Sequence, residues 1–64
     1  MTNEAKADQL SAAADRLGTS RGAAKRAAGY YAVGDESNGL AELQAAIRLA
    51  EEALATLTAV RDSR

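Results

Sequence analysis

Residues 34–39 read GDESNG, and this short run decides the fold. Gly, Asp, Ser and Asn are the residue types that form turns. Alanine-rich segments without proline flank the run on both sides. Glycine suits the end of a helix, and Gly34 is placed to fill that role. Asp, Ser or Asn suits the N-cap of the next helix, which gives three candidates: Asp35, Ser37 and Asn38. We therefore expect a turn over residues 34–38 that joins two helices.

The composition agrees with an all-α protein. Alanine supplies 17 of the 64 residues, proline is absent, and valine and isoleucine together number three. Alanine is the best helix former, and β-branched residues are the ones that strands favour. A chain of this length forms one small domain, residues 1–64, which is marginally stable as a monomer.

Several kinds of chemistry are excluded by the residues present. The chain has no cysteine and no histidine, which removes disulfides and most zinc and transition-metal sites. No nucleophile-base pair, phosphate-binding loop or paired catalytic carboxylate emerges. Glu42, Glu51 and Glu52 are expected to form a solvated face. We therefore expect no enzyme activity, no cofactor, no metal and no small-molecule substrate.

Apolar and small residues recur at spacings of three and four on both sides of the turn, which is typical of packed helices. We call this pattern the leucine stripe. Its members are Ala7, Leu10, Ala14, Leu17, Arg21, Ala24, Ala28 and Tyr31 before the turn, and Leu40, Leu43, Ile47, Ala50, Leu54 and Leu57 after it. Folding the chain at the turn aligns the two halves in pairs whose residue numbers total 71. The sequence therefore predicts an antiparallel two-helix hairpin, with helices over about 3–33 and 36–62, held together by the leucine stripe.

A second set of apolar and small residues lies beside the first, and we call it the alanine stripe. Its members are Ala13, Ala23, Ala27 and Tyr30 in the first helix, and Ala46, Leu49, Ala53, Thr56 and Val60 in the second. One hairpin cannot bury both stripes, whereas two hairpins in a four-helix bundle can. We therefore expect a homo-oligomer or a helical protein partner, bound through Tyr30, Ala46, Leu49, Ala53 and Val60. The corresponding function is a protein-protein interaction module: an adaptor, a regulator or an assembly subunit.

The stretch LSAAADRLGTSRGAAKRAAG, residues 10–29, supports an alternative function. It resembles the bacterial helix-turn-helix DNA-binding motif, with Ala14, Gly18, Ser20 and Ala24 at the characteristic positions. The resemblance implies a DNA-binding regulator in which Ser20 caps the second helix. Its phosphate and base contacts would come from Arg21, Lys25 and Arg26.

Residues 16–34 carry four basic and no acidic side chains, whereas the rest of the chain has a formal charge of -5. This local basic patch keeps a nucleic acid open as the alternative partner. The hairpin architecture is also similar to that of small dimeric helical hairpins that bind RNA through a helical face.

The glycines allow a different interpretation of the same stretch. Gly18, Gly22 and Gly29 would lie on one side of a continuous helix, which is kinked or broken at Gly18 if it is interrupted at all. The stripe keeps its phase through this point, which favours continuity. Arg21, which interrupts the stripe, is expected to lay its stem over the neighbouring helix and to carry its charge to water; Glu51 is a candidate ion-pair partner.

The amino-terminal residues MTNEAKADQL contain no apolar segment of the kind found in a signal peptide. No uncharged run approaches the ~18 residues that a membrane-spanning helix needs. The expectation is a cytoplasmic protein without membrane contact.

Overall fold

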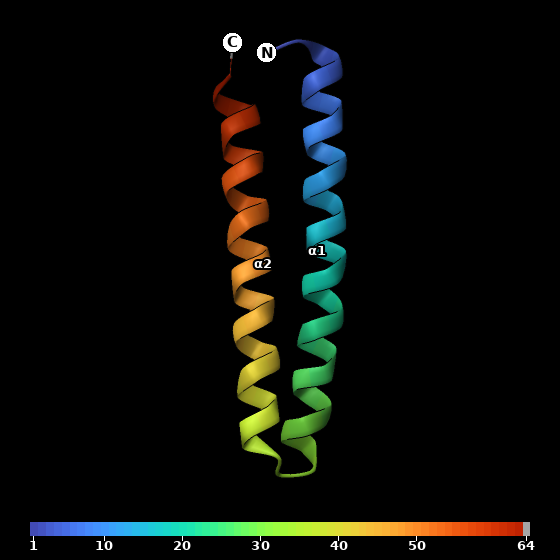
Figure 1. Cartoon of the computed structure of the whole chain (residues 1–64), viewed down its shortest axis with the longest axis vertical. Coiled ribbons are helices and arrows are strands. Elements are labelled where there is room, and N and C mark those ends of the chain that lie inside the picture. Colours follow the sequence, from blue (N-terminus) through green and yellow to red (C-terminus); the bar gives the residue numbers. More distant parts are fainter. Residues whose placement is uncertain (64) are drawn as a thin grey trace.

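The computed structural model describes residues 1–63 and contains two long helices. Helix α1 runs from Asn3 to Ala32 and helix α2 from Glu36 to Asp62. They lie antiparallel and side by side, so that the two termini meet at one end and the turn closes the other (Figure 1). The predicted all-α hairpin is confirmed, and each helix ends within one residue of the expected position.

The turn is built as the GDESNG sequence requires. Gly34 adopts a φ of 77°, a left-handed conformation that glycine accepts without strain. Its N–H donates to the carbonyl of Tyr31 at 3.1 Å, and the N–H of Asp35 donates to the carbonyl of Tyr30 at 2.9 Å. These two bonds define the Schellman motif, in which the last free carbonyls of a helix are satisfied. Of the three candidate caps, Asp35 is the N-cap of α2, and its carboxylate accepts from the N–H of Asn38 at 3.2 Å.

Helix α1 continues without interruption through residues 18–20. The hydroxyl of Thr19 donates to the carbonyl of Asp15, one turn earlier, at 3.1 Å, as a helical threonine does. The alternative of a break at Gly18 is therefore wrong for this structure, and continuity is confirmed.

The faces that hold the hairpin together differ from the expected ones. The buried residues are all small: Ala13, Ala23, Ala27, Gly39, Ala46 and Ala53. Most of them belong to the alanine stripe, whereas seven large members of the leucine stripe keep 38% to 63% of their exposure. The prediction that the leucine stripe joins the two helices is wrong. Almost every member of that stripe follows an inward-facing position by one residue, so each helix is turned by about 100° from the expected orientation.

The register of the two helices also differs from the prediction. The hydroxyl of Ser20 donates to the carbonyl of Ala46 at 2.8 Å, so residues whose numbers total 66 lie at one level. Two ion pairs that cross between the helices, Arg16 with Glu52 and Arg26 with Glu42, each total 68. The expected total of 71 is therefore wrong by three to five residues.

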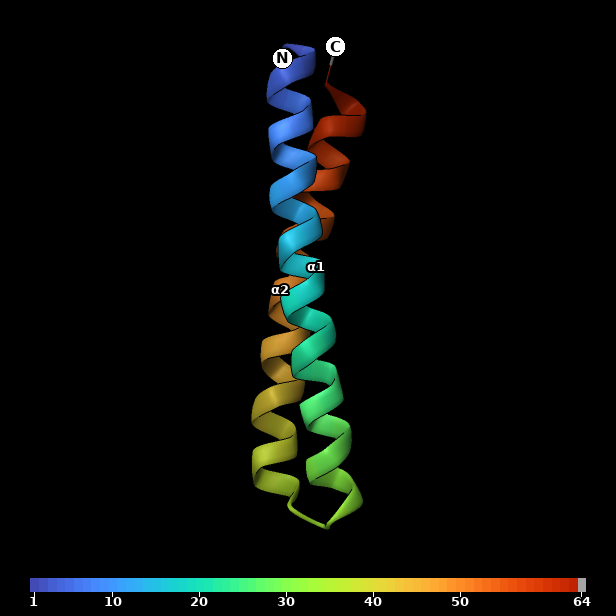
Figure 2. The ribbon, with the colours of Figure 1, turned by 90° about the vertical axis from the view of Figure 1, so that its right-hand side faces the viewer.

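The hairpin is a rod with no globular centre. Its Cα atoms extend over 47 × 14 × 11 Å, and their radius of gyration is 14.6 Å. A compact domain of this length has a radius of gyration of about 11 Å. The view in Figure 2 shows that the two helices also wind gently past each other along the rod. Every residue is therefore close to one of the two broad sides, and those sides are the surfaces available to a partner.

Candidate helix-docking face

The exposed members of the leucine stripe lie on one broad side of the hairpin. Each helix turns by about 100° per residue. Because the two helices run in opposite directions, one residue beyond an inward-facing position points to the same side of the pair on both. Ala28 follows buried Ala27 in this way, and Leu54 follows buried Ala53. The leucine stripe of α1 and that of α2 therefore form one continuous face.

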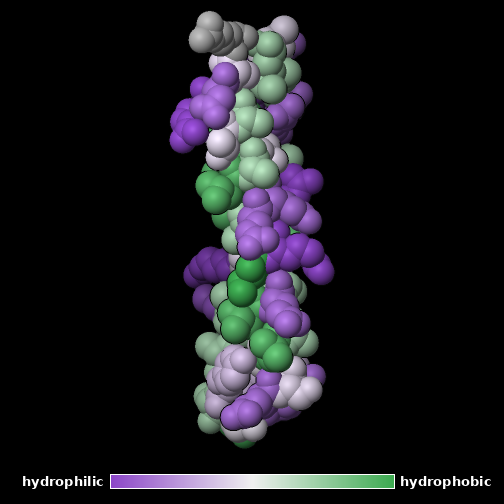
Figure 3. All heavy atoms as spheres, turned by 90° about the vertical axis from the view of Figure 1, so that its left-hand side faces the viewer, coloured by the Kyte–Doolittle hydropathy of each residue, from purple (hydrophilic) through white to green (hydrophobic). Residues whose placement is uncertain are grey.

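This face carries seven of the nine exposed large hydrophobic side chains found in residues 1–63. Leu54 is 63% exposed, and six others are between 38% and 48% exposed: Leu10, Leu17, Tyr31, Leu40, Leu43 and Ile47. Figure 3, seen from the α2 side, shows hydrophobic atoms gathered in a strip along the lower half of the rod. No large side chain is fully buried anywhere in residues 1–63. Apolar patches of this extent are a mark of interaction sites in soluble proteins.

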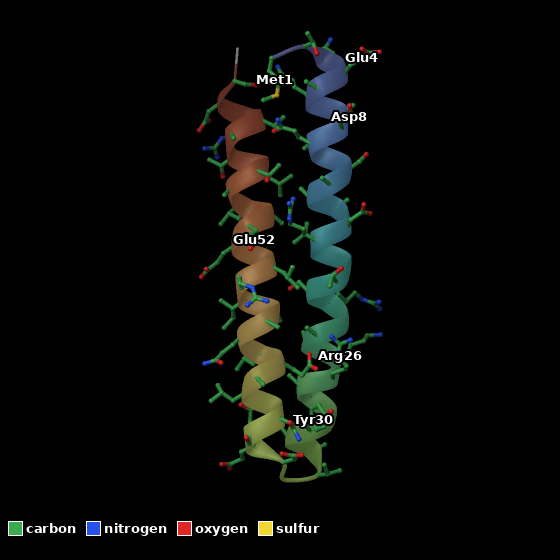
Figure 4. The ribbon with its side chains drawn as sticks, viewed as in Figure 1. Met1, Glu4, Asp8, Arg26, Tyr30 and Glu52 are labelled. Carbon is green, nitrogen blue, oxygen red and sulfur yellow. The ribbon has the colours of Figure 1, made fainter. Side chains whose placement is uncertain are left out.

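The opposite broad side is polar and is bridged by charges. Arg26 and Glu52 each precede a buried alanine by one residue, which turns them away from the leucine stripe. The Nε of Arg26 lies 3.1 Å from a carboxylate oxygen of Glu42, and the Nε of Arg16 lies 3.6 Å from one of Glu52. Figure 4 labels one residue of each pair, Arg26 and Glu52. The two broad sides of the hairpin are therefore chemically different.

These ion pairs change the interpretation of two groups of charges. Glu51 and Glu52 are exposed, as expected for a solvated face, while Glu42 is half-buried; Glu42 and Glu52 also pair with arginines of the other helix. Two of the four basic residues of the patch, Arg16 and Arg26, form ion pairs between the two helices of the hairpin. The expected pairing of Arg21 with Glu51 is absent from the structure as described, and Arg21 is exposed.

Two of the five residues expected to contact a partner lie instead between the two helices. Ala46 and Ala53 are buried there, at 6% and 0% exposure, so the prediction that they bind a partner is wrong. The half-buried members Tyr30, Leu49 and Val60 flank the same intramolecular interface. The physical reason is size: alanine and glycine let two helix backbones approach closely, which larger side chains prevent.

The residues of the predicted nucleic-acid surface are not brought together. Ser20 is half-buried between the helices and bonded to the backbone of α2. Arg26 is paired with Glu42. Of these four predicted contact residues, Arg21 and Lys25 are the two that are exposed and outside every ion pair found in residues 1–63.

No other kind of site is found in the described part of the chain. Residues 1–63 form no pocket and no cluster of three potential metal ligands. Neither α1 nor α2 has a stretch apolar enough to cross a bilayer. The leucine stripe is therefore the candidate functional site of the described residues.

Comparison with known proteins gives no relative. No family model matches the chain, and neither a curated protein nor a solved structure matches it at a significant level.

Proposed function

We propose that this protein is a non-enzymatic interaction module that docks onto another helical surface through its leucine stripe. The module would work as an adaptor, a regulator or an assembly subunit. Helix-helix packing is the chemistry of the contact, because the face consists of two parallel rows of side chains at helical spacing. The face that we propose differs from the one expected from the sequence, while the class of function is the same.

One observation carries this proposal. The hairpin buries alanines and a glycine, and it leaves five of its seven leucines, its isoleucine and Tyr31 exposed. Burying a side chain such as leucine yields roughly 1.5–3 kcal/mol, whereas one methylene yields roughly 0.8 kcal/mol. The leucine stripe keeps 38% to 63% exposure at seven large side chains, so a substantial part of the apolar stabilisation available to this chain is unused in the isolated hairpin. A partner that covers the leucine stripe would supply it.

The proposal is tested on the purified chain by sedimentation equilibrium and by binding of the apolar dye anilinonaphthalene sulfonate. We expect one of two results for the wild-type chain. Either its mass exceeds that of one chain, because the face is covered, or a single chain binds the dye at the free face. Ile47→Glu should abolish either behaviour while the helical circular dichroism persists, because Ile47 is 48% exposed in the hairpin.

Ala55→Glu is the matched control, since Ala55 is exposed on the same helix but lies outside the leucine stripe. It should behave as the wild type does. A wild-type chain that is a single, well-folded molecule and binds no dye would contradict the proposed function.

A further inference from the structure

We propose that the partner on the leucine stripe is a second copy of this chain, related by a twofold axis parallel to the helices. The two turns then lie at the same end, and α1 of each copy packs on α2 of the other. This inference rests on the proposed function and adds the identity and orientation of the partner.

The exposed area agrees with a second copy. The hairpin has an accessible surface of 4507 Å². A compact protein of its 6.6 kDa mass exposes about 3,900 Å². The excess is about 600 Å², and a stable interface buries about 800 Å² on each partner. If a second copy covers the leucine stripe, the accessible surface of each chain falls to about the value normal for its mass.

Stability gives a second reason. The interior of the single hairpin consists of small residues, with five alanines as its buried apolar side chains. Natural domains of this size that lack disulfides and metals rely on oligomerisation or on unusually dense helix packing. The chain has no cysteine, so two hairpins that share one leucine-rich interior meet this need.

The twofold axis fixes the register without any adjustable shift. Rotation about an axis parallel to the helices keeps every residue at its own level along the rod. A residue of α1 therefore meets, on α2 of the second copy, the same level that it meets on its own α2, where the numbers total 66 to 68.

In this register the side chains of the two faces differ in size at most levels. Leu17 falls opposite Ala50 of the second copy, which is the one small residue among the six stripe positions of α2. Three alanines of α1 fall opposite leucines in the same way: Ala14 opposite Leu54, Ala24 opposite Leu43, and Ala28 opposite Leu40. Small opposite large fills the space between helices without voids. Turning the second copy end over end about the level of Ala50 instead places large residues of α2 against each other, such as Ile47 against Leu54.

Charge agrees with the same arrangement. Arg21 falls at the level of Ile47 of the second copy, and Glu51 follows Ile47 by one helical turn toward the outer edge. Within residues 1–63 of one hairpin, neither Arg21 nor Glu51 has an ion-pair partner, and both are exposed. The dimer would pair each Arg21 with Glu51 of the other copy, at both edges of the interface.

Cysteine cross-linking tests the orientation on the full chain, which has no cysteine of its own. Chains with Leu17→Cys and chains with Ala50→Cys are refolded separately and as a mixture, then oxidised. We expect a cross-linked pair in the mixture and none in either variant alone. In the proposed dimer the two copies of α1 lie diagonally across the bundle, as do the two copies of α2. Leu17→Cys mixed with Ala55→Cys is the control and should not cross-link, because Ala55 lies off the stripe.

Three results would overturn the inference. One is a wild-type mass of a single chain at all concentrations; dye binding at the free face would then leave the proposed function standing. The second is efficient cross-linking of either variant with itself, which would show that the second copy is turned end over end. The third is a dimer in which the mixture forms no cross-link.

A charge exchange adds a separate check. Arg21→Glu should weaken the dimer measurably, and the double variant Arg21→Glu, Glu51→Arg should restore it.

Discussion

Two long stripes of this hairpin have the same helical periodicity but differ in their exposure to solvent. The alanine stripe is buried between α1 and α2, whereas the leucine stripe is exposed along one broad side. If hydrophobicity alone decided which face packs, the leucines would have been buried. The difference teaches that closeness of approach, which depends on side-chain size, selects the intramolecular interface here.

Two contacts between α1 and α2 show how closely the helices approach. The hydroxyl of Ser20 reaches the backbone carbonyl of Ala46 at 2.8 Å. At Gly39, an added Cβ would lie 2.9 Å from the ring of Tyr31, which is closer than van der Waals contact. The position of Gly39 therefore has no room for a side chain.

The largest effect is expected from enlarging a residue of the buried face. Ala53→Leu inserts three carbon atoms where the side chain is 0% exposed. Overpacking of this kind costs about 1–3 kcal/mol. Urea unfolding followed by circular dichroism should show this loss, with a lower midpoint. Ala55→Leu, the same change at an exposed position, should stay within about 0.5 kcal/mol of wild type. Equal losses in the two variants would show that the alanine stripe is not tightly packed.

A smaller effect, of opposite sign, is expected from glycine in the exposed part of α1. Gly18 is helical, and an added Cβ meets nothing within 4 Å. Gly18→Ala should therefore raise the unfolding free energy by about 1 kcal/mol, because alanine favours the helix by that amount. Gly39→Ala should instead lower the unfolding free energy, since its Cβ would lie 2.9 Å from the ring of Tyr31 and overpacking costs about 1–3 kcal/mol. A loss of stability in Gly18→Ala would indicate a turn at residues 18–20, as in a helix-turn-helix.

A still smaller effect is expected on the polar side. Arg26→Gln removes the ion pair with Glu42, whose side chain retains 26% of its exposure. Ion pairs at surfaces contribute about 0.2–1 kcal/mol, and salt screens them. The thermal midpoint should fall slightly at low salt, and the difference from wild type should shrink as salt is added. A loss that is large and independent of salt would show that the polar side contributes more than the ion pair.

The smallest effect on stability is expected from Arg21 and Lys25, the two residues of the basic patch that lie outside the ion pairs of residues 1–63. Arg21→Gln with Lys25→Gln should change the unfolding free energy of the isolated hairpin by less than about 0.5 kcal/mol. We also expect wild type and variant to elute alike from immobilised DNA and RNA at low salt, because the net charge of the chain is -1. Retention of the wild type alone would favour the nucleic-acid alternative over the interaction module.

The sequence predicted both stripes of residues, but it assigned the alanine stripe to the partner and the leucine stripe to the contact between the two helices. The leucine stripe and the alanine stripe were both recognised from spacing, and both were assigned to helix packing. The signal that separates them is the size of the side chains: Gly39, Ala46 and Ala53 recur every seven residues in α2, and each is small. Arg26 and Glu42 could not be paired beforehand, because their pairing depends on the register.

The sequence by itself determined that this chain forms two helices and where they end. The GDESNG turn, the glycine at position 34, the cap at Asp35 and the alanine-rich arms act locally, through backbone conformation and hydrogen bonds between near neighbours. Only the tertiary structure decided which sides of the helices meet and at what level. Two stripes one residue apart have the same period, so periodicity cannot rank them. The choice follows from how closely two backbones approach when Ala13, Ser20, Ala27 and their counterparts on α2 lie between them.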